Sequence, residues 1–187
     1  MLLYRIAPYS SAAADSSQPG HPSYLHKPAQ GYGRVDNAGI YDVWYLSRTE
    51  AGAVGEVFAR YTEWQEVMFD FRAIAGARYA LHTYSVHDDC KIIDLDDAQA
   101  LVDVGLRPTQ VVTRNRTVTQ RWAQKLYNQT TMTGMAWDGV QWWSRHHSDW
   151  PVLGLWRTAP TYVRTSELSM AHSAVVDAAG TLNRRTK

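Results

Sequence analysis

The sequence predicts a single domain of the α+β class, and three observations lead to this prediction. The chain has 187 residues, the length of one ordinary domain. Its 45% hydrophobic and 20% charged residues are typical of a soluble globular protein. Strand-like and helix-like segments follow one another without the regular βαβ alternation of a doubly wound sheet.

The N-terminal part is expected to contain two strands separated by a long loop. The apolar residues 2–7 predict a first strand, which Pro8 should end because proline cannot donate to a β-ladder. Residues 10–30 are rich in Ser, Ala, Gly and Pro, which predicts an irregular surface loop. The aromatic and β-branched residues in 41–46 predict a second strand.

A helix is expected directly after the second strand. Ser47 and Glu50 have the spacing of a capping box, with Ser47 as the N-cap. The helix should reach about Tyr61, because apolar residues recur at helical spacing. These residues are Ala53, Val54, Val57 and Phe58. Glu56 belongs to this helix and lies at the side of the apolar stripe.

The remaining chain mixes both kinds of element. Segments with strand composition are residues 80–86, 91–95, 140–143 and 152–156. Segments with helical periodicity are residues 97–104, 118–128 and about 171–178. We expect residues 1–160 to form the body of the domain and residues 161–187 to add a helix and a basic, frayed tail.

Charge and cysteine content exclude several classes of protein. The formal net charge is +1, so the whole chain lacks the basic excess of a nucleic-acid-binding protein. No apolar run approaches the ~18 residues of a membrane span, so no membrane partner is expected. The single cysteine, Cys90, cannot form an internal disulfide, which favours the reducing cytoplasm. His and Cys residues have no metal-site spacing, so no metal ion is expected.

Four residues form the candidate active site: Arg34, Tyr45, Glu56 and Ser144. Tyr45 follows Arg34 by eleven residues, and Glu56 follows Tyr45 by eleven. Arginine suits a phosphate, tyrosine an aromatic base, and a lone glutamate a developing cation. Ser144 is expected to contact a second phosphate. This set of side chains indicates an enzyme acting on a dinucleotide.

The same residues and their neighbours resemble the RES domain family. The resemblance extends from about Leu2 to Trp156, in the motifs Tyr4-Arg5, Gly33-Arg34, Tyr45-Leu46, Glu56-Val57 and Asp138-Gly139…Ser144. It implies the fold of ADP-ribosyltransferase toxins, with a central mixed or antiparallel sheet and flanking helices. The implied substrate is NAD⁺, cleaved by phosphorolysis to nicotinamide and ADP-ribose 1″-phosphate, with inorganic phosphate as co-substrate and no true cofactor. The implied partner is an Xre-like helix-turn-helix antitoxin or an immunity protein.

The resemblance also suggests which residues hold NAD⁺: Arg5, Arg34, Asn37 and Tyr45. Tyr45 would stack on nicotinamide or donate its hydroxyl to the ribose. The chain departs from the family pattern at Val35 and Asp36, which stand between Arg34 and Asn37. Three alternatives stay open: an NAD⁺ glycohydrolase, a protein ADP-ribosyltransferase, and a non-catalytic interaction module.

Overall fold

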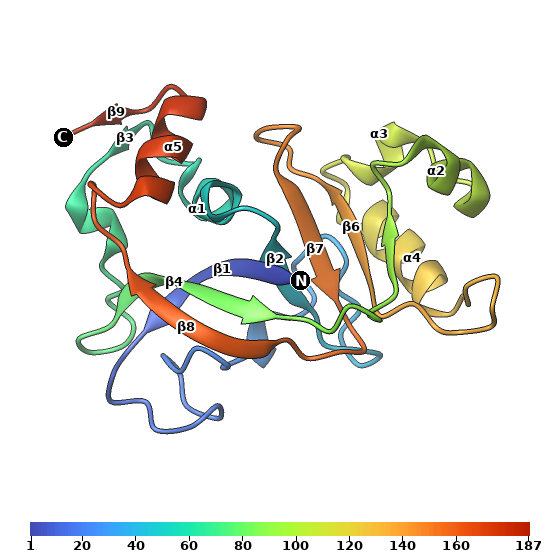
Figure 1. Ribbon diagram of the computed structural model, residues 1–187, viewed down its shortest axis with the longest axis horizontal. Coiled ribbons are helices and arrows are strands. Elements are labelled where there is room, and N and C mark those ends of the chain that lie inside the picture. The colour runs from blue at the N-terminus through green and yellow to red at the C-terminus, as the bar shows by residue number, and fades with distance from the viewer.

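A seven-stranded sheet forms the centre of the computed structural model, which describes residues 1–187. Its strand order is β5-β6-β7-β2-β1-β4-β8 (Figure 1). The strands are β1 (Leu2–Tyr9), β2 (Trp44–Ser47), β4 (Arg78–Ser85), β5 (Ile92–Asp94), β6 (Gly139–Trp143), β7 (Pro151–Leu155) and β8 (Thr161–Glu167). A separate two-stranded sheet pairs β3 (Glu63–Trp64) with β9 (Arg185–Thr186).

The central sheet is mixed, as expected. All its neighbouring strands pair antiparallel except β5 and β6, which run parallel. β4 and β5 follow each other in the chain but lie in different parts of the sheet. Together with the helices, this arrangement confirms the α+β prediction.

Helices gather at both ends of the sheet. α1 (Glu50–Phe58) and α5 (Ser173–Thr181) pack against each other, and α1 also contacts β1 and β2. The second group lies beside β5 and β6 and appears at the right of Figure 1. It consists of α2 (Ala98–Val104), α3 (Pro108–Val111) and α4 (Arg116–Tyr127). Short 3-10 helices are η1 (Lys27–Ala29) and η2 (Glu66–Phe69).

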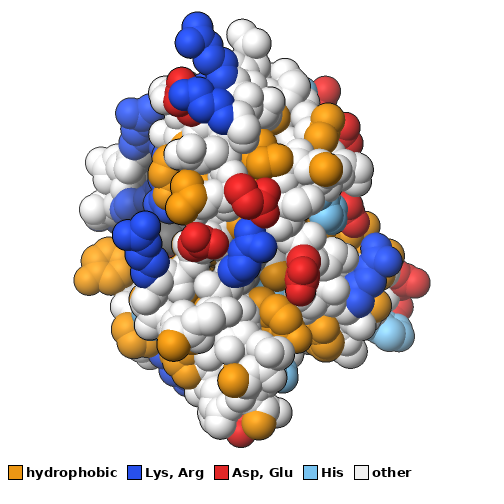
Figure 2. Space-filling view, turned by 90° about the vertical axis from the view of Figure 1, so that its left-hand side faces the viewer, with side chains coloured by type: hydrophobic (Ala, Val, Ile, Leu, Met, Phe, Trp, Pro, Cys, Tyr) orange, Lys and Arg blue, Asp and Glu red, His pale blue; other side chains and the backbone are white.

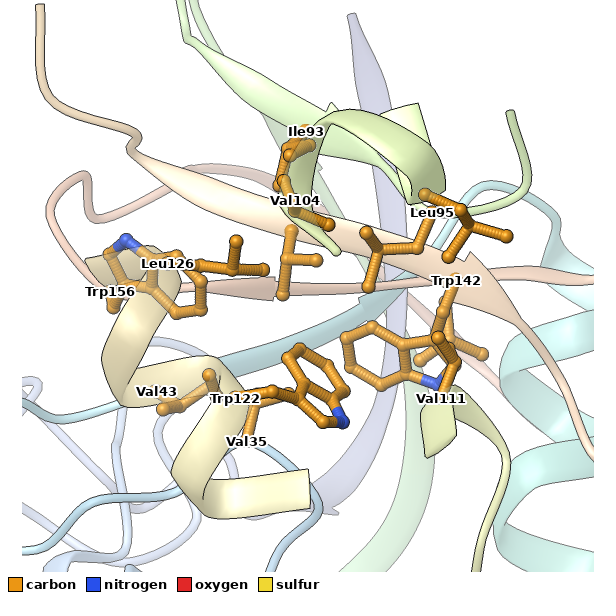
Figure 3. Close-up of a cluster of buried hydrophobic side chains, with 14 of the residues drawn as sticks. Val35, Val43, Ile93, Leu95, Val104, Val111, Trp122, Leu126, Trp142 and Trp156 are labelled. Atoms are coloured by element: carbon orange, nitrogen blue, oxygen red, sulfur yellow. The ribbon is translucent and has the colours of Figure 1, made fainter. Parts of the chain in front are cut away.

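The hydrophobic core is divided in the same way. One cluster joins α2, α3 and α4 to β5 and β6, and Trp122 and Trp142 are among its large side chains (Figure 3). A second cluster joins α1 and α5 to β1 and β4, with Phe58 and Trp64 fully buried.

The predicted start and end of α1 are wrong. The N-cap of α1 is Thr49, whose hydroxyl accepts from the Gly52 amide at 3.0 Å. Ser47 cannot be the cap because it pairs with Tyr4 and Val152 as the last residue of β2. At its other end, α1 stops at Phe58 rather than at Tyr61.

Pro8 does not end the first strand, which continues to Tyr9. β2 pairs with β1 only at Tyr4↔Ser47, so no strand lies beside Pro8 on that edge of β1. The missing N–H group of proline therefore removes no hydrogen bond from the sheet.

The sequence pattern does not indicate β8, and the frayed C-terminus that it predicts is wrong. Instead, β9 pairs with β3, and Lys187 forms an ion pair with Glu63 at 2.7 Å. Residues 10–30 contain turns and η1 and are held on the sheet, where Tyr84 donates to the Pro22 carbonyl at 2.6 Å. None of the helices combines the length and the apolar character needed to cross a bilayer.

Candidate active site

A cavity of about 390 Å³ opens between α1, the end of β6 and the N-terminus of α4. Strands β1 and β2 form its floor. The lining residues that carry polar chemistry are Tyr4, Arg5, Arg34, Tyr45, Ser47, Glu56, Arg116, Arg145 and His146. Glu56 is the only carboxylate among the lining residues.

Glu56 is brought to the cavity by close packing of α1. A Cβ atom on Gly55 would lie 2.2 Å from the ring of Trp150, so only glycine allows this approach. Trp150 belongs to the β6–β7 connection, and its carbonyl accepts from the amide of Ser144 at 2.9 Å. α1 and the end of β6 are therefore held together.

Ser144 fixes the carboxylate of Glu56. Its hydroxyl donates to Oε1 of Glu56 at 2.5 Å and accepts from the His146 amide at 3.0 Å. The serine is buried, with 3% of its surface exposed, and it is not a lining residue. The sequence predicted that Ser144 binds phosphate, but in the structure its one hydrogen is directed at Glu56.

Arg34 is anchored on one side and open on the other. Its Nη1 donates to the carbonyl oxygens of Val111 and Thr113, at 2.5 and 2.9 Å. Those carbonyls lie at the end of α3 and just after it, so they fix the direction of the guanidinium. The Nε and Nη2 groups remain for a ligand, in the fork geometry that suits phosphate.

Tyr45 contributes its ring to the cavity, while its hydroxyl is engaged elsewhere. The hydroxyl donates to Oδ1 of Asp36 at 2.6 Å and accepts from the amide of Val35 at 2.9 Å. Burial, reinforced by the Asp36 carboxylate, raises the pKa of Tyr45. The ring packs edge-on against Trp142, with centroids 6.3 Å apart. Of the two expected roles, the structure leaves Tyr45 free for stacking rather than for donating to ribose.

Positive charge dominates the cavity wall. Burial lowers the pKa of Arg34, and the nearby Arg116 and Arg145 lower it further. Burial also lowers the pKa of His146, and the Glu56 carboxylate acts in the opposite direction. By contrast, acidic and basic side chains alternate on the outer face that carries β3 and β9 (Figure 2). Four arginines line the cavity with a single carboxylate, and such an excess of positive charge is typical of an anion site.

Two predicted ligand residues lie differently from expectation. Arg5 contributes to the cavity wall, but its guanidinium stacks over Trp44 and donates to the Tyr24 carbonyl at 3.5 Å. Burial lowers the pKa of Arg5. Asn37 is not a lining residue, since its amide donates to the Tyr41 hydroxyl and the Gln120 carbonyl. Asn37 therefore supports the loop instead of facing the cavity.

The sequence of the chain matches the model of a known protein family. The model for the RES domain matches residues 2–177, which is most of the chain. The chain belongs to the RES domain family. This match extends beyond Trp156, where the resemblance in the sequence motifs ends, and includes β8 and most of α5.

A solved structure shares the fold of this RES domain. It is the crystal structure of the MbcT–MbcA toxin–antitoxin complex of M.tuberculosis, with a TM-score of 0.57 and 18% sequence identity. The alignment covers 97% of this chain and 88% of the other. No curated protein matches.

The sequence motifs contain most of the polar residues of this RES domain's cavity, but not all of them. Arg34, Tyr45 and Glu56 all line the cavity, and Ser144 contacts it through Glu56. Arg116 was not predicted, because an exposed arginine at the start of a helix has no distinguishing pattern. Asp36 was noted only as a departure from the family pattern, yet its carboxylate holds Tyr45.

Proposed function

We propose that this RES domain cleaves the bond between nicotinamide and ribose in NAD⁺. The observation that carries the proposal is the pairing of one carboxylate, Glu56, with an arginine cluster in a single cavity. A dinucleotide needs both features, because its pyrophosphate is anionic and its nicotinamide ribose becomes cationic as the bond breaks.

The proposed mechanism relies on charge stabilisation. As the C1″–N bond lengthens, nicotinamide leaves as a neutral molecule with the bonding electron pair, and positive charge develops on the ribose. The carboxylate of Glu56 stabilises that charge, and the hydrogen bond from Ser144 keeps it in one orientation. The ring of Tyr45 supplies an apolar surface for the nicotinamide.

The arginine cluster favours an anionic nucleophile. In phosphorolysis an oxygen of HPO₄²⁻ forms a bond to C1″ as the bond to nicotinamide breaks, and the product is ADP-ribose 1″-phosphate. Arg116 and Arg145 stand on the cavity wall with Arg34, so one part of the cluster can hold pyrophosphate while another holds inorganic phosphate. If water is the acceptor instead of phosphate, the protein is an NAD⁺ glycohydrolase. If a protein side chain is the acceptor, it is an ADP-ribosyltransferase.

The test follows nicotinamide from purified protein and NAD⁺, in phosphate and in phosphate-free buffer. We expect release to depend on phosphate, with ADP-ribose 1″-phosphate identified by ³¹P NMR. Equal release in both buffers, with free ADP-ribose as product, identifies a glycohydrolase. A mass increase on added lysate proteins identifies a transferase. No nicotinamide in any condition rejects the proposal and favours a non-catalytic module.

We also propose that the protein is the toxin of a toxin–antitoxin pair and acts in the cytoplasm, where NAD⁺ is available. The support is the family and the fold shared with a protein crystallised in a toxin–antitoxin complex. The expected partner is an Xre-like antitoxin or an immunity protein that covers the cavity. Induced expression should stop growth and lower cellular NAD⁺, whereas E56Q should do neither.

A further inference from the structure

Asp36 is a buried carboxylate whose charge is not balanced by an ion pair. Only 2% of its surface is exposed, and none of the ion pairs in the structure includes it. Burying a carboxylate is costly unless hydrogen bonds replace the lost water. Asp36 accepts three: from the Gly31 amide at 2.8 Å, the Gly33 amide at 2.7 Å and the Tyr45 hydroxyl at 2.6 Å.

These hydrogen bonds hold the residues directly before and after Arg34 in the chain. The residue before it, Gly33, donates its amide to Asp36. The residue after it, Val35, donates its amide to the hydroxyl of Tyr45, which in turn donates to Asp36. The backbone on both sides of Arg34 is therefore fixed by one connected group.

Gly33 is needed for this arrangement. A Cβ atom there would lie 2.2 Å from the Tyr45 hydroxyl oxygen and 2.7 Å from Oδ1 of Asp36. The opposite side of the turn is also held, since Nε2 of Gln120 donates to the carbonyls of Gly31 and Gly33. A turn fixed through both its amides and its carbonyls presents the arginine in one position.

We propose that Asp36 is the positioning residue that holds Arg34 and Tyr45 for the dinucleotide. It acts through the backbone of the Gly31–Val35 turn and through the direction of the Tyr45 hydroxyl, without touching the ligand. Because the single hydrogen of that hydroxyl is taken by Asp36, Tyr45 offers the ligand its ring. The nature of the ligand rests on the proposed function; the role of Asp36 in the turn does not.

Three variants test the proposal. Asp36→Ala removes both carboxylate oxygens and with them all three hydrogen bonds. Asp36→Asn keeps one oxygen for the two glycine amides but places an N–H₂ opposite the Tyr45 hydroxyl, which must then turn its hydrogen away. Asp42→Ala is the matched control, because Asp42 is exposed and pairs only with Lys27, at 3.3 Å.

Binding should weaken in the Asp36 variants while the chemical step is largely kept. We expect Asp36→Ala to raise KM for NAD⁺ and Kd for ADP-ribose at least tenfold, with kcat changed less than about threefold. Asp36→Asn should show a smaller change in the same direction, and Asp42→Ala none. If both Asp36 variants fold and keep the wild-type KM and Kd, the proposal is wrong, even if their thermal stability falls.

Hydrogen exchange tests the same idea without substrate. The Gly31 and Gly33 amides should exchange at least tenfold faster in Asp36→Ala than in wild type, and at the wild-type rate in Asp42→Ala. This measurement stands even if the wild-type protein releases no nicotinamide, which would reject the proposed function alone. Unchanged exchange in a folded Asp36→Ala overturns the proposal. If Asp36→Ala does not fold, Asp36→Asn decides through KM and Kd, and wild-type values in that variant overturn the proposal.

Discussion

At the scale of single residues, Glu56 and Ser144 form a unit in which the serine orients the carboxylate. Glu56→Gln keeps the shape but removes the negative charge, so nicotinamide release should fall at least ~100-fold. Ser144→Ala leaves the charge and removes one charge-assisted hydrogen bond, so release should fall ~10-fold. Single-turnover assays with saturating NAD⁺ measure both effects. A larger loss in Ser144→Ala than in Glu56→Gln would contradict this order.

Arg116 gives a second prediction at this scale, because it lines the cavity from the first turn of α4. Arg116→Gln should raise KM for phosphate by ~10-fold or more, since it removes one charged contact to an anion. Arg121 lies on the same helix, is exposed and is not a lining residue, so Arg121→Gln is the control and should leave KM for phosphate unchanged. Equal effects of the two substitutions would indicate that arginine acts through the general electrostatic field of the protein and not through a phosphate-binding site.

At the scale of elements, the close approach of α1 to Trp150 determines where Glu56 lies. Gly55→Ala would place a methyl group within 2.9 Å of three atoms of the Trp150 ring, so helix and ring must separate. We expect a loss of ~1–3 kcal/mol in unfolding free energy, from overpacking, and reduced activity. Gly180→Ala in α5 is the control, because a Cβ there meets nothing within 4 Å. That change should be neutral or stabilising by up to ~1 kcal/mol in urea unfolding.

Local patterns predicted most elements because periodicity and capping depend on near neighbours. Asp97 caps α2 through the Ala100 amide. The wrong predictions occur where a tertiary contact determines the local structure. Ser47 has the spacing of a cap but is required by β2, and β8 is mostly exposed at the sheet edge, so it lacks the apolar signal of a buried strand.

At the scale of the whole molecule, the site joins segments that no local pattern connects. Glu56 and Ser144 are 88 residues apart, and Arg34 is held by carbonyls 77 and 79 residues away. The family resemblance identified the residues that meet. It did not predict that Ser144 donates to Glu56, that Asn37 lies outside the cavity, or that Asp36 accepts from the amides of the Gly31–Val35 turn. These features depend on hydrogen bonds of individual side chains.

The whole fold also has a built-in pH dependence through His82 on β4. This residue is fully buried, its Nδ1 is 2.8 Å from the Thr165 hydroxyl, and its Nε2 has no hydrogen-bond partner. Burial lowers the pKa of His82 to about 4, and the charge of Arg5 acts in the same direction. Below its usual pKa of ~6.5 the unfolded chain takes up a proton that the folded protein does not accept.

Folding stability should therefore be full above pH 6.5 and decrease as the pH falls toward 4, by at most about 3 kcal/mol from this residue. Urea unfolding between pH 5 and 7 measures the slope before carboxylates titrate. His82→Gln should reduce that slope whatever its effect on stability at pH 7, and a smaller slope from His146, whose pKa burial also lowers, should remain. His87→Gln is the control, since His87 is exposed and should keep the wild-type slope. An unchanged slope in His82→Gln would assign the pH dependence to other groups and contradict the prediction.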